Sequence, residues 1–250
     1  MTLKLIVNAD DFGLSRAVNL GIAEAFANGI VRSTTLMAGM PAFDHAVAIA
    51  GQHPGLGTGI HLTLSMGRPV LAGHKTLTDE QGLFKHQDFF HHHIDQIDLA
   101  EVQAEFIAQI EKAQAAGLTI THLDGHHHVH GISGIREIVC QLCQRYGLAA
   151  RPIDEEHKAM FRQSNVKIPD GLSTSFFGES VTIEGLQRLI MDFDGQSLEV
   201  MSHPGYLDRF IYENSSYNIK RIYELSVLTS DEMQKWIEER GIILCGYDGL

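Results

Sequence analysis

The chain repeatedly alternates a short β-branched or apolar run with a longer segment of helical periodicity, and this alternation constrains the fold most. A buried strand is predicted at Leu3–Asn8. A helix over Ser15–Asn28 follows it, because Ser15 can cap the first turn and apolar residues recur at helical spacing before Gly29. Repeated strand–helix alternation predicts a parallel sheet, since parallel strands need long crossover connections.

The same reasoning extends along the rest of the chain. Further strands are predicted at Ser33–Met37, Thr58–Leu64, Leu118–Asp124, Leu148–Arg151, Leu198–Ser202 and Ile242–Leu244. Further helices are predicted at Phe43–Gln52, Leu99–Ala116, Ser133–Tyr146, Glu184–Phe193 and Asp231–Arg240. Residues 65–95 lack clear periodicity, which predicts a long loop insertion. We also expect residues 152–180 to be irregular.

Either an α/β barrel or an open doubly wound sheet would satisfy this pattern. No glycine-rich nucleotide-binding loop follows the first strand, and polar motifs instead follow several different strands. We therefore expect an α/β, TIM-like barrel with a mostly parallel sheet. We expect residues 1–250 to form it as a single catalytic domain, because α/β barrels often have this length.

Charge and composition narrow the function classes. The formal net charge of −12 argues against binding to a nucleic-acid backbone as the main role. There is no signal-peptide pattern after Met1, and no run approaches the roughly 18 apolar residues of a membrane span. Three cysteines fit a reducing compartment better than a disulfide framework. We expect a cytoplasmic protein without a nucleic-acid or membrane partner. The sequence is compatible with a homodimer but does not decide the oligomeric state.

The densest chemical signal is a run of nine residues that holds five of the fifteen histidines and an aspartate. In an extended conformation His122, Asp124, His126, His128 and His130 would share one face. If a helix starts early, His126 and His130 would instead lie one turn apart. The spacing does not choose between these conformations, but histidine is the commonest protein metal ligand, so the run indicates a metal-dependent active site.

Asp10 and Asp11 follow the first predicted strand directly. Two adjacent carboxylates at a strand end are costly unless they are paired, hydrated or bound to a cation. In an extended segment their side chains point in opposite directions. One of them can therefore bind a metal ion while its neighbour faces the substrate.

Three further residues stand at or near predicted strand ends. His61 is the one histidine in an apolar strand, and His203 begins a His-Pro-Gly turn that proline and glycine make sharp and stiff. Arg151 ends a short strand, where it could orient a carboxylate or a substrate oxygen. One carboxylate and two histidines around a divalent ion leave open positions for water and substrate. The chain thus offers Asp11, His61 and a cluster histidine for the metal, with Asp10 as base and His203 as acid.

Together these motifs resemble the YdjC-like carbohydrate deacetylases, a family that includes the chitooligosaccharide (diacetylchitobiose) deacetylases. The resemblance runs in order from about residue 3 to the C-terminus. It rests on residues 8–13, 34–37, 61–64, 121–130, 175–179, 202–205 and 225–230.

The resemblance implies a distorted β/α barrel and one divalent metal ion, Mg²⁺ or Zn²⁺, held by an Asp-His-His set. Carried over by position, those ligands are Asp11, His61 and His126, while Asp10 matches the base and His203 the acid. This chain has a glycine directly before His126 where the family often has serine, a change that should leave the ligand in place.

The candidates for substrate binding are then Arg151 and three polar residues of the histidine run: His130, His128 and Asp124. The expected reaction is hydrolytic removal of an N-acetyl group from an acetylated carbohydrate such as diacetylchitobiose, with a role in chitin degradation. The metal would hold the acetyl carbonyl and the attacking water. A metal-dependent phosphoesterase and a non-catalytic sugar-binding protein on the same fold are the alternatives.

Overall fold

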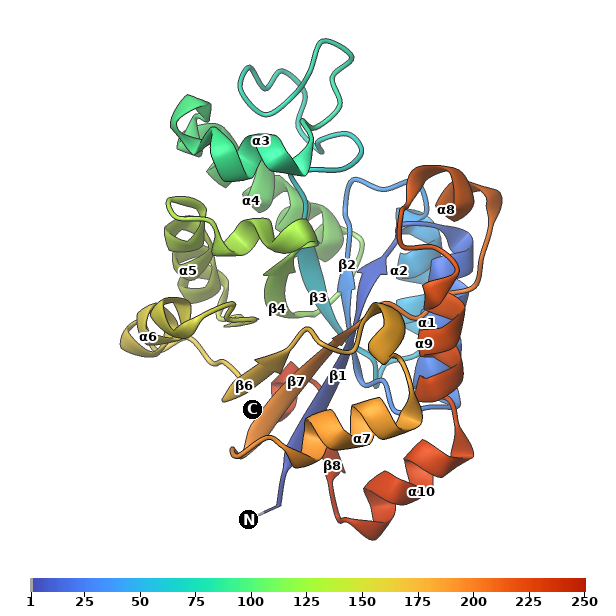
Figure 1. Ribbon diagram of the computed structural model, residues 1–250. Helices are drawn as coiled ribbons and strands as arrows, with labels where there is room; N and C mark the ends of the chain where they lie inside the picture. Colours follow the sequence, from blue (N-terminus) through green and yellow to red (C-terminus); the bar gives the residue numbers. More distant parts are fainter. Residues whose placement is uncertain (1) are drawn as a thin grey trace.

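The strands of the molecule form one curled parallel sheet (Figure 1). In the computed structural model, which describes residues 2–250, the strands are β1 (Lys4–Phe12), β2 (Ser33–Leu36), β3 (Gly57–Leu62), β4 (Ile120–Gly125), β5 (Ala149–Ala150), β6 (Gly171–Ser173), β7 (Ser197–Ser202) and β8 (Ile243–Leu244). Their order is β5-β4-β3-β2-β1-β7-β6, with β8 beside β1, and every pairing is parallel.

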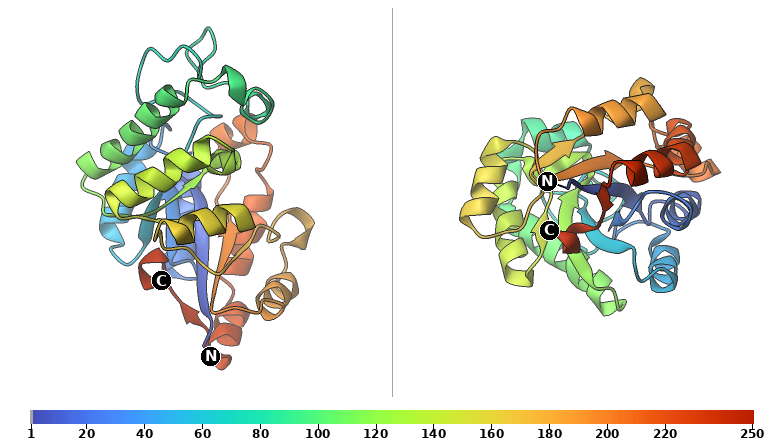
Figure 2. Two further views of the ribbon diagram at one scale, coloured as in Figure 1. Left: turned by 90° about the vertical axis from the view of Figure 1, so that its left-hand side faces the viewer. Right: turned by 90° about the horizontal axis from the view of Figure 1, so that it is seen from below.

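The helices lie on the outside of the curled sheet, as the view from below shows (Figure 2). They are α1 (Arg16–Ala27), α2 (Phe43–Gln52), α3 (Gln87–His92), α4 (Leu99–Ala115), α5 (Ile135–Tyr146), α6 (Glu155–Gln163), α7 (Ile183–Met191), α8 (Arg209–Asn214), α9 (Lys220–Leu228) and α10 (Asp231–Glu239). Short 3₁₀ turns are η1 (Ile94–Gln96), η2 (His126–Gly131), η3 (Gly178–Ser180) and η4 (Tyr247–Gly249). The predicted distorted, mostly parallel β/α barrel is confirmed. No helix within residues 2–250 is both long and apolar enough to cross a membrane.

The two faces of β1 show how the barrel is filled. Leu5, Val7 and Ala9 belong to the large apolar core that the strands share with the outer helices. The alternating residues, among them Asn8 and Asp10, point to the other face because side chains alternate along a strand. That inner face is apolar only near the strand starts and is otherwise a buried polar network, which a structural core alone would not need.

The short connecting loops at the strand starts and the C-terminal segment close the lower end of the barrel. Tyr247 of η4 packs against Ile6 and Ala149 and stacks on the His122 ring at a centroid distance of 3.7 Å. The chain termini lie near one another at this end (Figures 1 and 2). The strands point away from it, so their C-terminal ends open toward the opposite side.

Most predicted elements are present, but two regions differ from the expectation. The segment 152–180, predicted to be irregular, holds α6 and β6, and the unassigned residues after β7 form α8 and α9. Helix α6 buries only His157 and Phe161, while α9 buries Arg221 and Glu224 among its inward residues. Polar residues at inward positions hide the apolar periodicity by which helices are recognised.

The predicted insertion at 65–95 contains only the short helix α3 and one isolated bridge, Thr78 to Phe84. Two carboxylates of α4 nevertheless fasten it. Glu105 is fully buried and accepts hydrogen bonds from the backbone N–H groups of Val70 and Leu71 at 2.8 and 3.0 Å. Glu101 accepts hydrogen bonds from the backbone N–H groups of Lys75 and Thr76. The insertion rises above the strand ends (teal in Figure 1) and forms one wall of the opening there.

Candidate active site

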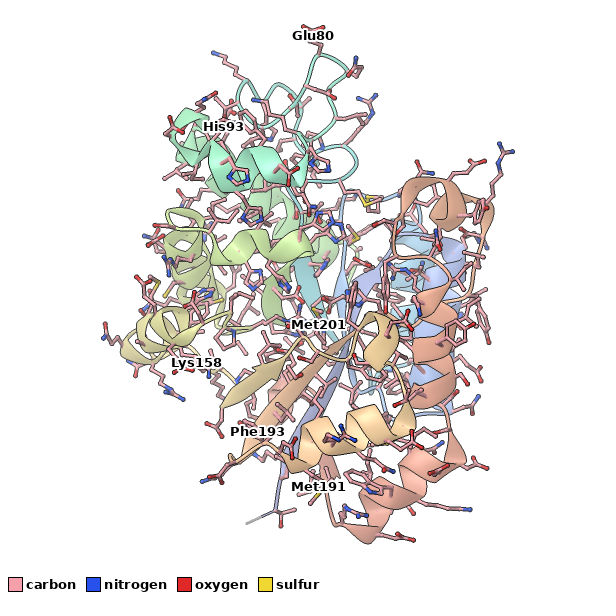
Figure 3. All side chains as sticks on the ribbon, in the orientation of Figure 1. Glu80, His93, Lys158, Met191, Phe193 and Met201 are labelled. Atoms are coloured by element: carbon pink, nitrogen blue, oxygen red, sulfur yellow. The ribbon has the colours of Figure 1, made fainter. Side chains whose placement is uncertain are left out.

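A cleft of about 680 Å³ opens at the C-terminal ends of the strands. Its floor comes from β1, β3, η2 and the end of β7, one wall comes from the insertion, and the other comes from residues 174–177 and 214–221. Met201, which lines the cleft, lies near the middle of the molecule in Figure 3, whereas Glu80 and His93 lie far above it on the insertion. Polar motifs that are distant in the sequence therefore meet in one cavity.

Three predicted ligands converge on one point of the cleft floor. Asp11 Oδ1 lies 3.0 Å from His126 Nδ1 and 3.5 Å from His61 Nε2, and the two histidine nitrogens are 3.3 Å apart. A tetrahedral metal ion with bonds of about 2.0–2.1 Å places its ligand atoms about 3.3 Å from one another. All three side chains are buried, and Asp11 Oδ1 has no hydrogen-bond partner. This Asp-His-His set could therefore hold a metal ion.

Neighbouring groups aim these ligands at the shared point. His61 Nδ1 lies 2.7 Å from Asp124 Oδ1, so the opposite ring nitrogen, Nε2, faces the site. Asp11 Oδ2 accepts a hydrogen bond of 2.6 Å from Arg221, which leaves Oδ1 for the site. Hydrogen bonds of this kind commonly fix the orientation of metal ligands. The chain thus supplies both the ligand atoms and their orientation.

The backbone at Asp11 corrects the expectation that the two aspartates point in opposite directions. The β1–β2 register shifts between Ala9 and Phe12, and Asp11 has a φ of 71°, in the left-handed region. This bulge turns the chain so that Asp10 and Asp11 line the same cleft. A positive φ outside glycine is uncommon, and aspartate tolerates it better than most residues.

Charges in the site keep its groups in defined protonation states. Burial raises the pKa of Asp11, but Arg221, His126 and His61 outweigh it and hold that pKa well below its usual range. Burial lowers the pKa of His126, although Asp11 opposes the shift. An ionised carboxylate beside a neutral imidazole suits a divalent cation. Burial lowers the pKa of His61, but Asp124 and the two β1 aspartates outweigh it and raise that pKa to about 9, so this ring must release a proton when an ion binds.

Asp10 is held by a buried arginine. Arg151 is fully buried and binds both Asp10 oxygens at 2.7 Å, while its other contacts go to Asp124 at 2.9 Å and to Glu199 at 2.7 and 2.8 Å. Three of these contacts are hydrogen bonds, one to Glu199 and two to Asp10, and the others are ion pairs that surround the guanidinium with carboxylates. Burial raises the pKa of Asp10, but Arg151 outweighs it and holds that pKa far below its usual range.

Arg151 is fully buried and is not among the residues that line the cleft, so the prediction that it contacts substrate is wrong. Of the two roles considered for it, its contacts match the orientation of a carboxylate, Asp10. Asp124 is also fully buried, between His61 and Arg151, and His130, near the end of η2, is fully buried. Of the four predicted substrate-binding residues, only His128 lines the cleft.

The histidine run adopts neither of the two conformations considered. It is extended through Gly125 and then turns sharply in η2, where His127 and His128 have φ values of 52° and 56°. The turn sends His126 toward Asp11 and His130 to the opposite side. A Cβ on Gly125 would lie 2.8 Å from His130 Nδ1, so glycine gives that ring the space it occupies.

The turn after β7 places His203 on the cleft wall. Gly205 packs so closely on α1 that a Cβ on Gly21 would lie 2.5 Å from the Gly205 Cα. Glu224 of α9 accepts a short hydrogen bond from the His203 backbone, and its other oxygen lies 3.8 Å from His203 Nδ1. Burial lowers the pKa of His203, but Glu224 outweighs it and raises that pKa above its ordinary value. His203 is thus suited to carry a proton.

Sequence reasoning missed two α9 residues that support this cleft. Arg221 contacts Asp11, and Glu224 contacts both His203 and the Tyr217 hydroxyl. Glu199 was also missed, although it contacts Arg151 and accepts a hydrogen bond from Tyr247. The available signal was the charge itself, since Glu199 stands in an otherwise apolar strand and Arg221 and Glu224 sit at i and i+3 on one helix face.

Comparison with known proteins agrees with this geometry. A family model described as YdjC-like protein matches residues 4–239. Carbohydrate deacetylase 1 of Listeria innocua is 39% identical over 251 residues, covering 99% of this chain and 100% of that protein. The carbohydrate deacetylase of Brevibacillus brevis is 41% identical with the same coverage.

Solved structures show the same fold. A protein of Enterococcus faecalis V583, whose suggested role is cellobiose-phosphate cleavage, superposes with a TM-score of 0.92 at 36% identity, covering 100% of this chain and 99% of its own. An uncharacterized protein of Agrobacterium tumefaciens C58 has a TM-score of 0.59 at 13% identity, covering 99% of this chain and 89% of its own, and shares the fold alone. With the family model spanning nearly the whole chain and relatives near 40% identity over their full length, this protein belongs to the YdjC-like family.

Proposed function

We propose that this protein is a metal-dependent carbohydrate deacetylase. It hydrolyses the N-acetyl group of an N-acetylglucosamine-containing oligosaccharide, such as diacetylchitobiose, and thereby takes part in chitin breakdown. The observation that carries the proposal is the Asp11–His61–His126 triangle, which shares one cleft with a buried carboxylate, Asp10, and a histidine, His203. The names of the Listeria and Brevibacillus relatives support the same activity.

Each remaining residue has a defined part in the reaction. A divalent ion held by Asp11, His61 and His126 would polarise the acetyl carbonyl and lower the pKa of a water molecule. Asp10, kept ionised by Arg151, accepts a proton from the attacking water. His203 donates a proton to the sugar nitrogen as the C–N bond breaks, so the products are acetate and the free amino sugar.

The donor set bears on the metal. Two imidazole nitrogens and one carboxylate suit Zn²⁺, whereas Mg²⁺ prefers oxygen ligands and keeps several waters. We therefore propose that the site binds Zn²⁺ in preference to Mg²⁺. Calorimetric titration of the metal-free protein with each ion tests this preference. Tighter binding of Mg²⁺ than of Zn²⁺ would reverse it.

Phosphoester hydrolysis is the second candidate, because the Enterococcus relative has a suggested role on a phosphorylated disaccharide. The cleft favours a neutral substrate. Among the described residues that line it, Arg221 is the only Lys or Arg; its Nη2 is bound to Asp11, and its Nη1, which has no partner, is buried. A second acidic group, Asp10, His61 and Asp124, could coordinate an ion by spacing, but Arg151 already bridges its two carboxylates.

Acetate release decides between these functions. The purified protein is stripped of metal, reloaded, and assayed on diacetylchitobiose and on cellobiose phosphate in parallel. The proposal predicts metal-dependent acetate release and no phosphate release. Asp10→Asn should retain metal but lose turnover, which separates a hydrolase from a sugar-binding protein. Phosphate release without acetate release would establish the alternative.

A further inference from the structure

Phe177 is a large apolar side chain that the fold leaves open to the cleft. It lies just before η3 (the yellow-orange segment after β6 in Figure 1), and 46% of its surface is exposed. Its ring stacks on Tyr217 at a centroid distance of 4.1 Å and an interplanar angle of 14°. Since Tyr217 covers one face of the ring, the exposed surface is on the other face and the edge. Both residues line the cleft.

Hydrogen bonds hold this aromatic pair in place. Ser180 Oγ accepts a bond of 3.2 Å from the Phe177 backbone N–H and donates one of 2.7 Å to the Phe177 carbonyl. The Tyr217 hydroxyl accepts a bond of 3.3 Å from the Gly178 N–H and donates to Glu224. A ligand that covers Phe177 therefore meets a surface that is already ordered, so binding costs little conformational entropy.

The pair is built into the wall that carries His203. The His203 ring lies edge-to-face with both aromatic rings, at centroid distances of 5.8 Å to Phe177 and 5.4 Å to Tyr217. Glu224 contacts His203 and Tyr217 together. A six-membered ring lying on Phe177 would thus occupy the cleft beside the wall that carries His203.

The surroundings of Phe177 match the surface of a sugar. The polar side chains of Thr174, Asn214, Ser215 and Ser216 line the same part of the cleft. A pyranose ring has an apolar face of C–H groups, which suits the electron-rich face of an aromatic ring, and a rim of hydroxyls, which suits hydroxyl and amide side chains. Asn214 Nδ2 and Ser215 Oγ already donate to the backbone carbonyls of Phe210 and Tyr217. A sugar would therefore meet the Asn214 side-chain oxygen and the Thr174 and Ser216 hydroxyls.

We propose that Phe177, backed by Tyr217, is a stacking platform for the pyranose ring that bears the acetamido group, and that it determines specificity for amino sugars over small acetylated compounds without a sugar ring. This inference rests on the proposed deacetylation. Phe177 acts on binding, whereas the groups on the cleft floor act on bond cleavage.

The test compares Phe177→Ala and Phe177→Trp with Tyr212→Ala, a control whose aromatic ring is 64% exposed on α8 and is not among the residues that line the cleft. For Phe177→Ala we expect KM on diacetylchitobiose to rise about tenfold while kcat stays within about twofold. Phe177→Trp should restore KM, and Tyr212→Ala should leave it unchanged. Turnover of a small non-sugar substrate, 4-nitrophenyl acetate, should be equal in all four proteins.

Two further measurements distinguish failure of the platform from failure of the proposed deacetylation. An equal loss on the sugar and on 4-nitrophenyl acetate, or no change in KM for Phe177→Ala, would overturn the platform. The affinity for chitobiose, measured by calorimetry, does not depend on hydrolysis. If the parent binds chitobiose, Phe177→Ala binds it more weakly, and neither protein releases acetate from diacetylchitobiose, the platform is supported and the proposed deacetylation is refuted. Thermal melting verifies that each variant is folded.

Discussion

The two sides of the cleft are built in different ways. The metal-facing side takes Asp11, His61 and His126 from the ends of β1, β3 and β4, each directly after or within a recognisable strand. The acid-bearing side takes only His203 from a strand end, and its support comes from Glu224, Tyr217 and Arg221 on or before α9. Parallel strands deliver their ends to one place, whereas a helix surface is placed by packing. The residues of the metal-facing side could therefore be predicted from the sequence, whereas those that support His203 could not.

The largest expected effect is loss of a metal ligand. His126→Ala should abolish metal binding and lower acetate release by about 10³-fold or more, because one corner of the ligand triangle disappears. His127→Ala is the matched control, since that neighbouring side chain is exposed and lies outside the ligand triangle; it hydrogen-bonds to Ser65, and its ring centroid lies 3.9 Å from that of the His126 ring. Metal content by elemental analysis checks both variants. Equal metal content in the His126 variant and the parent would refute the assignment.

Arg221 tests whether the acid-bearing side also supports the metal. Arg221→Lys keeps the charge but loses the planar fork that binds Asp11 Oδ2 at 2.6 Å and the Tyr217 carbonyl at 2.8 Å. We expect metal affinity to fall about 10–100-fold, as for other residues that orient a ligand. Arg209→Lys, in an exposed pair with Glu213, should leave the affinity unchanged. If both variants bind metal like the parent, the two sides are independent.

Glu224 tests how the acid is maintained. Glu224→Gln removes the main group that raises the pKa of His203, although Asp10 and Asp11 still contribute. The acid must be protonated, so the parent should keep its activity as pH rises until it passes the raised pKa. The variant should lose activity at lower pH, and the gap between the two should widen as pH increases. A profile of kcat/KM against pH measures this, with Glu213→Gln on exposed α8 as control. Superimposable profiles would show that Glu224 has no such role.

The smallest expected effect concerns the closed end of the barrel, away from both sides. Tyr247→Phe keeps the ring stacked on His122 but removes the hydroxyl that donates to Glu199. Leaving a buried acceptor without its partner should lower the free energy of unfolding by about 1–3 kcal/mol. Activity should stay near that of the parent, because Arg151 still holds Asp10. Urea denaturation measures the change, and Tyr146→Phe, whose hydroxyl contacts Glu111 in an exposed pair, should have little effect.

The strands and helices could be predicted where apolar periodicity is clean. Helix α2 was predicted with its observed ends, and Ser15 caps α1 as expected by accepting a hydrogen bond from Val18. Helices α6 and α9 were not predicted, since their inward positions carry His157, Arg221 and Glu224. For the site, the residues predicted to share a cavity do so, but three of the four predicted substrate contacts are buried.

The amino-acid sequence by itself determined the parallel α/β sheet and the residues that meet at its C-terminal edge, because hydrophobic periodicity and strand direction are local properties. Only the tertiary structure decided what each polar residue contacts. Arg151 became the buried partner of three carboxylates, and Arg221 reached Asp11 across 210 residues of chain. Such pairs depend on how distant elements pack, and an ion pair leaves no periodic signal in either segment that forms it.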